Sequence, residues 1–348
     1  MKTKNSVDIY KIWVTMAAFV VIVAGIKAAS TIIIPLLLSI FIATVSAPAM
    51  FALERLKLPR ILAFLIVLAC VIGLLLGFAY ILSSSLDGFL ANMPQYKAKL
   101  LSMVDFLQAF FQRFGMELSK KDLQLMFDPS ELLNIFGTFL KTFSTILSKS
   151  FLIFLGVTFM LFETSSLKTK IYILINKDSS LENPFEMFSK NLNKYLAIKT
   201  IISLITGIII GLGLLILGVD FALLLGMIAF LLNYIPNIGA VIAAVPAVLV
   251  ALVGLDSNSI LLVITLYVSV NIIMGNIIEP RYMGKGLGLS VLVIFFSLVF
   301  WGWVLGPVGM FLAVPISMTI KIALDSHPST RPIAMILSSI DNSENANP

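Results

Sequence analysis

The chain has 348 residues, of which 59% are hydrophobic and 12% charged, and its mean hydropathy is +1.05. Soluble domains contain roughly 45–50% apolar and about 25% charged residues, so a soluble fold of this size could not hide so much apolar surface. The one cysteine, Cys70, excludes an internal disulfide and a cysteine-cluster metal site, and the one histidine, His327, lies in the polar tail, which excludes a serine–histidine protease. The net charge of +6 comes from basic residues scattered between apolar runs, which is typical of membrane topology and not of nucleic-acid binding. We therefore expect an integral membrane protein that is not an enzyme and has no cofactor, metal or nucleic-acid partner.

The first 82 residues contain three apolar runs that predict three transmembrane helices. The runs are Ile12 to Ile26, Ile32 to Leu53 and Ile61 to Leu82, and a helix needs about 20 residues to cross the hydrocarbon core. The second run follows the first almost at once, which favours an uncleaved membrane hairpin over a signal peptide.

Residues 83–150 form the one large segment that is not predicted to span the membrane. Apolar residues recur in it at helical spacing, for example at Leu100, Val104 and Leu107. The pattern predicts amphipathic helices that lie on the outer membrane face or pack against each other. A ligand-binding ectodomain is the alternative.

Residues 151–324 are predicted to form a transmembrane transport region. Its apolar runs are Phe151 to Phe162, Tyr195 to Val219, Phe221 to Ile235, Ile260 to Ile278 and Leu287 to Ile320. The predicted fold class is therefore all-α and polytopic, with about eight transmembrane segments.

Lysine and arginine in short loops predict the orientation of these segments. They place the N-terminus, the loops 54–60, 163–199 and 279–285, and Lys321 in the cytoplasm. Both termini are then cytoplasmic, and residues 325–348 are predicted to be a flexible tail.

Two apolar runs are interrupted by glycine and proline. Pro236 lacks a backbone N–H and disfavours helix at the preceding residue, so we expect a helical hairpin near 220–254 that breaks at this proline. Gly306-Pro307 predicts a second broken hairpin near 288–323, and in both segments Ala-Val-Pro follows the break. Pairs of broken hairpins in related sequence are typical of secondary transporters, which use them to build a site near the membrane midplane.

Polar and helix-breaking residues inside these runs are the candidate solute pathway. They are Asn233, Pro236, Asn237, Gly239, Asn271, Asn276, Gly306, Pro307 and Gly309. Uncharged amides and free carbonyls at membrane depth suit a neutral, hydroxylated solute. Glu279 and Arg281 flank Pro280 at a predicted cytoplasmic end, where we expect either a gate or ion-coupling site or an interfacial ion pair.

Two further groups have simpler interpretations. Gly207, Gly211 and Gly218, together with Ser203 and Thr206, predict a close helix-packing surface, within the chain or between subunits, and only secondarily a path for substrate. Asp220 and Asp256 are expected to be loop charges at the outer ends of spans.

An ordered set of short motifs resembles the AI-2E family of transporters over nearly the whole chain. The motifs are Pro236-Asn-Ile-Gly239, Glu279-Pro-Arg-Tyr-Met-Gly284, Gly288-Leu-Ser290, Phe300 to Gly309 and Ala313-Val-Pro315. The resemblance implies a multi-pass transporter of the bacterial inner membrane that moves small solutes or signals. It also implies homo-oligomers, such as pentamers, whose hairpins move in an elevator-like manner. Ala240 and Val291 depart from the pattern, since many relatives have proline at both positions.

The first functional hypothesis is a secondary transporter that exports a small polar solute such as the quorum-sensing signal autoinducer-2. The second is a sodium(lithium)/proton antiporter, an activity that the resemblance also implies, with Glu279 as the coupling carboxylate. The third is a scaffold that uses residues 83–150 for docking. The chain has no Gly-x-x-x-x-Gly-Lys-[Ser/Thr] loop, which argues against direct use of ATP.

Overall fold

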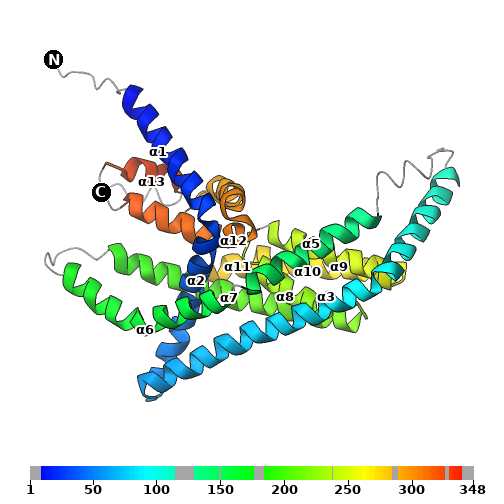
Figure 1. Ribbon diagram of the computed structural model, residues 1–348, viewed down its shortest axis with the longest axis horizontal. Coiled ribbons are helices and arrows are strands. Elements are labelled where there is room, and N and C mark those ends of the chain that lie inside the picture. The colour runs from blue at the N-terminus through cyan, green and yellow to red at the C-terminus, as the bar shows by residue number, and fades with distance from the viewer. Residues whose placement is uncertain are drawn as a thin grey trace. The chain divides into compact units, whose positions relative to one another are not determined.

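The computed structural model describes residues 9–113, 129–148, 150–175, 184–236, 238–283, 289–325 and 329–338. All regular elements in these ranges are helices, as Figure 1 shows, which confirms the predicted all-α class. They are α1 (Ile9–Ala28), α2 (Ser30–Arg55), α3 (Arg60–Arg113), α5 (Pro129–Ser148), α6 (Ser150–Ile175), α7 (Pro184–Ile216), α8 (Ala222–Leu232), α9 (Ile238–Gly254), α10 (Ser257–Asn271), the π-helix η1 (Ile272–Ile278), α11 (Glu279–Met283), α12 (Val291–Asp325) and α13 (Arg331–Leu337).

Within the described ranges, five helical segments are long and apolar enough to cross a membrane. They are Ser30–Arg55, Arg60–Ser102, Leu192–Ile216, Ser257–Tyr282 and Val291–Asp325. Shorter apolar helices are Trp13–Ala28, Ser150–Glu163, Ala222–Leu232 and Ile238–Gly254. A multi-pass membrane protein is therefore supported, and the total of about eight crossings stays a prediction.

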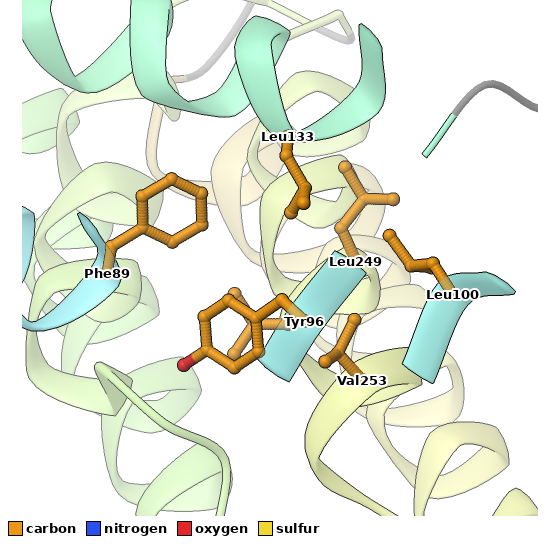
Figure 2. Close-up of a pocket in the computed structure, with 7 residues that line it drawn as sticks. Phe89, Tyr96, Leu100, Leu133, Leu249 and Val253 are labelled. Atoms are coloured by element: carbon orange, nitrogen blue, oxygen red, sulfur yellow. The ribbon is translucent and has the colours of Figure 1, made fainter. Parts of the chain in front are cut away.

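Helix α3 is longer than the apolar run that predicts it. The boundary expected at residues 82 and 83 lies inside this one helix, which continues past Pro94 to Arg113. Hydropathy marks where a lipid-compatible stretch ends, but a helix continues for as long as its residues tolerate helical dihedral angles. The continuation of α3 lies against α5, and a small apolar cavity lies between α3, α5 and α9, where Phe89, Leu133 and Leu249 are among its lining residues (Figure 2).

The chain divides into two compact units. The first contains Met1–Ala43, Leu155–Ser179 and Gly288–Pro348, and the second contains Thr44–Phe154 and Ser180–Leu287. In the first unit, Val23 of α1 is buried with Val304 and Leu305 of α12. The Ser290 N–H donates to the Leu337 carbonyl over 3.0 Å, which ties the end of α13 to the start of α12.

The second unit is organised around a close crossing of α7 and α8. A Cβ added to Gly226 of α8 would lie 2.7 Å from the Gly211 Cα and 2.8 Å from the Gly207 carbonyl oxygen of α7. Small residues on both sides let the two backbones touch, as in other close transmembrane crossings. Gly207 and Gly211 of the predicted glycine surface therefore join two helices of the same chain, whereas Gly218 lies beyond the end of α7 with φ 73° and takes no part in the crossing.

Gly226→Ala is expected to lower the free energy of unfolding by about 1–3 kcal/mol. The added methyl group would meet backbone atoms, which cannot move aside as a side chain can. Thermal unfolding of the purified protein in detergent measures the effect, with Gly77→Ala as the control, because nothing lies within 4 Å of a Cβ built at Gly77. Equal melting temperatures for Gly226→Ala and wild type would contradict the close crossing.

Candidate functional site

Four polar residues of α7, named here the α7 stripe, lie on or beside one buried face of this helix. Lys199, Ser203 and Thr206 are spaced by four and three residues, which places them on one face, and Thr200 is adjacent. Lys199 is 2% exposed, Ser203 0% and Thr206 7%. They belong to a segment, Leu192–Ile216, that is apolar enough to span a membrane. Polar groups there cost free energy unless they find partners or face a solute.

Two partners of the α7 stripe come from the break between α8 and α9. Asn233 donates from Nδ2 to the Ser203 hydroxyl over 2.9 Å, and the Tyr234 hydroxyl donates to the Thr200 hydroxyl over 2.7 Å. Helix α8 ends at Leu232 and α9 begins at Ile238, on either side of Pro236. Because proline donates no backbone hydrogen bond, the chain turns here and presents Asn233 and Tyr234 to α7.

Helices α8 and α9 lie alongside each other in opposite directions. A Cβ built on Gly239 would overlap the Leu232 carbonyl oxygen and lie 2.7 Å from its carbon, so only glycine fits at the turn. At the other end, a Cβ on Gly254 would lie 3.9 Å from the Asp220 carboxylate. That carboxylate also accepts a hydrogen bond from Tyr96 of α3 over 3.1 Å, so Asp220 ties α3 to this end of the pair.

The third partner of the α7 stripe is Glu279, the first residue of α11. The Lys199 ammonium lies 2.6 Å from the Glu279 carboxylate, with Lys199 2% and Glu279 19% exposed. Arg281, which the sequence placed beside Glu279 as a second charge, is exposed. The sequence therefore indicates Glu279 and Arg281, whereas the structure pairs Glu279 with Lys199.

Sequence reasoning missed Lys199 because it assigned this residue to the end of the cytoplasmic loop 163–199. One signal was present: the spacing of Lys199, Ser203 and Thr206 puts the lysine on the same helical face as two other polar residues. Thr200 lies within the predicted span Tyr195 to Val219, and no sequence signal indicated it.

A small cavity lies where α7, the α8–α9 break and α10 meet. Its polar lining residues are Thr206, Asn233, Tyr267 and Asn271, and its volume is about 10 Å³, which is room for about one water molecule. Asn233 and Asn271 are predicted pathway residues, and the structure brings them to one cavity. Thr206 was expected to serve helix packing, and no sequence signal indicated Tyr267.

The π-helix η1 connects this cavity to the ion pair. It begins directly after Asn271 and ends directly before Glu279, and Met274 within it also lines the cavity. Segments of π-helix are uncommon and frequently occur at functional sites. A change in the winding of η1 would move Glu279 relative to Asn271.

The remaining predicted pathway residues of the second unit do not line this cavity in the described structure. Asn276 is exposed on η1, and Pro236 is half-buried at the break. Asn237 lies outside the described residues.

Gly306, Pro307 and Gly309 belong to the first unit. Gly306 has φ 67° and ψ −153°, which breaks α12 into two arms at the predicted place. A Cβ on Gly309 would overlap the Trp301 carbonyl oxygen and lie 2.6 Å from its carbon. Ser317 donates to Ser297 over 2.8 Å, so the arms lie alongside each other. The close approach at Gly309 repeats, in different residues, the one at Gly239.

Comparison with known proteins shows the family of the chain. The sequence model of the AI-2E family transporters matches residues 16–329 of this chain. The chain is 38% identical to the AI-2 transport protein TqsA of Escherichia coli (strain K12), over 95% of this chain and 96% of TqsA. It is 37% identical to a protein of Haemophilus influenzae over 97% of this chain and 99% of the relative, and 35% identical to Escherichia coli YhhT over 92% of both chains.

The match extends over most of the described elements, from α1 to α12, and includes both breaks and the α7 stripe. The chain belongs to the AI-2E family of transporters.

Proposed function

We propose that the protein is a secondary transporter of the bacterial inner membrane that exports a small, neutral, polar solute similar to autoinducer-2. The observation that carries the proposal is the cavity between α7 and α10, which is lined by neutral hydroxyl and amide groups and otherwise by apolar side chains. Similarity to TqsA, a named AI-2 transport protein, supports the choice of solute class.

The two Gly/Pro breaks supply the mobile elements of this proposal. Each break forms a pair of short helical arms, α8–α9 and the two arms of α12, and we propose that both are membrane hairpins. A helix that stops within the membrane leaves backbone carbonyls and N–H groups for a solute or for a neighbouring helix. The proposed assembly is a homo-oligomer with both termini in the cytoplasm.

The Lys199–Glu279 pair is the proposed inner gate. Under the positive-inside rule, the basic loop 279–285 lies in the cytoplasm, so the ion pair lies at the cytoplasmic end of the route. A closed ion pair presents little net charge to a neutral solute, and its opening frees the path between η1 and α7.

Flux into proteoliposomes that contain only the purified protein tests the proposal. Wild type is expected to move labelled autoinducer-2 saturably, and Asn233→Ala is expected to reduce kcat/KM at least tenfold, because it loses the Ser203 contact and a cavity amide. Asn134→Ala on the exposed face of α5 is the matched control.

A parallel set of vesicles carries a pH dye and receives sodium pulses. Absence of autoinducer-2 flux in wild type would overturn the proposal. Sodium-driven proton movement that is lost in Glu279→Gln would replace it with cation/proton antiport.

A further inference from the structure

The hydroxyl of Tyr267 is a buried donor without a partner. Tyr267 lies on α10, is 6% exposed, and is the one described residue whose buried side-chain polar atom makes no hydrogen bond. Buried tyrosine hydroxyls usually have a partner, because a buried donor without one loses its hydration and gains nothing in return. Tyr267 lines the same cavity as Thr206, Asn233 and Asn271, so a molecule in this cavity is within reach of its hydroxyl.

Two neighbouring lining residues, Thr206 and Asn233, also carry oxygen atoms that can accept a hydrogen bond. The Thr206 hydroxyl proton goes to the Ile202 carbonyl over 2.9 Å, which leaves the lone pairs of this oxygen. Asn233 uses its Nδ2 for Ser203, and its amide oxygen remains an acceptor. One donor and two acceptors around a single small space are the complement of a hydroxyl group or a water molecule, both of which donate and accept.

The lining of the cavity excludes a charged ligand. Its lining residues carry no charged side chain, and a bare ion in this cavity would lose its hydration without a counter-charge to compensate. The nearest ion pair, Lys199 with Glu279, is internally neutralised.

We propose that Tyr267 is a recognition residue for one hydroxyl group of the transported solute, and that a water molecule takes this place when the solute is absent. The inference rests on the proposed function and deepens it: the solute class is small, neutral and hydroxylated. A volume of about 10 Å³ admits one hydroxyl and no more. Asn233 and Asn271 are only half-buried, so the cavity reaches the surface of its unit beside them, and the rest of the solute lies there.

The test compares Tyr267→Phe, which removes one oxygen atom and keeps the ring, with Tyr282→Phe on the exposed side of α11. In proteoliposomes, Tyr267→Phe is expected to raise KM for labelled autoinducer-2 about tenfold and to change kcat less than about twofold, since a site that hydrogen-bonds a hydroxyl discriminates through that bond. Tyr282→Phe is expected to match wild type. Equal KM values for Tyr267→Phe and wild type would overturn the inference.

Equilibrium binding separates this inference from the proposed function. Tritiated autoinducer-2 and tritiated D-ribose, a neutral pentose, are bound to the purified full chain in detergent. Saturable binding of either probe to wild type that weakens about tenfold in Tyr267→Phe supports the hydroxyl site even if flux is absent, in which case only the transport proposal fails. Flux in wild type with unchanged binding in Tyr267→Phe overturns the site alone. Binding of neither probe to wild type also overturns the site.

Melting temperature gives an independent readout of the water. If the cavity were empty, Tyr267→Phe would remove an unsatisfied hydroxyl and raise the melting temperature above that of wild type. If water or solute binds there, the substitution removes a satisfied hydroxyl, and the melting temperature stays the same or falls. A melting temperature above that of wild type in Tyr267→Phe, but not in the control Tyr282→Phe, would overturn the inference.

Discussion

Glu279→Gln is expected to lower the free energy of unfolding by about 3–5 kcal/mol, because it leaves the Lys199 ammonium buried without a counter-charge. Lys199→Met is expected to cost less, since Glu279 is partly exposed and can regain some hydration. Thermal unfolding in detergent measures both variants. Lys194→Met and Arg281→Gln, which remove exposed charges nearby, are the controls and are expected to change stability by less than about 0.5 kcal/mol.

The double variant Lys199→Met/Glu279→Met distinguishes a gating role of the ion pair from a purely structural role. Replacement of a buried ion pair by apolar residues of similar volume is often neutral, so the double variant is expected to recover most of the lost stability. If the pair gates the route, autoinducer-2 flux stays at least tenfold below wild type although the protein is stable again. Recovery of both stability and flux would show that the pair is structural and that the gate lies elsewhere.

Gly239→Ala and Gly309→Ala are each expected to lower the free energy of unfolding by about 3 kcal/mol, the upper end of the usual cost of overpacking. In both cases the new methyl group overlaps a backbone carbonyl, that of Leu232 or of Trp301, so the two arms must separate. The measurement is the melting temperature together with flux. Flux is expected to fall more than tenfold in Gly239→Ala, because the same turn positions Asn233 against Ser203.

Two glycines in open positions serve as matched controls. A Cβ at Gly73 of α3 or Gly25 of α1 has nothing within 4 Å, and alanine there is expected to be neutral or stabilising by up to about 1 kcal/mol. If Gly239→Ala and Gly309→Ala behave like these controls, the close approach of the arms is wrong.

The sequence predicts the breaks well because their causes are local. Pro236 removes a backbone donor at its own position, and Gly306 adopts a dihedral pair that other residues rarely reach, so both effects are visible without knowledge of any neighbour. For the same reason composition is enough for the membrane class and the helical class. The end of α3 was not predictable in this way, because loss of hydropathy after Leu82 says nothing about whether the helix continues.

The sequence also indicates which residues need partners, but not which partners they have. Asn233, Asn271 and Glu279 are conspicuous as polar residues in or beside apolar runs, and two of them line one cavity. Lys199 and Tyr267 are not conspicuous, since a lysine near a span end and a tyrosine in a span are both common.

The tertiary structure alone decided that Glu279 pairs with Lys199, 80 positions away in the chain, and that the Tyr267 hydroxyl lies at the cavity of Asn233. Both depend on how α7 and α10 are rotated about their axes and on which helices are neighbours. Backbone contacts at the glycine crossing place α8 against α7, and those at Gly239 place α9 against α8. Hydropathy and periodicity are properties of one segment at a time, so they indicate that polar groups lie within apolar segments of this protein. Which partner each polar group contacts depends on how the helices pack against one another.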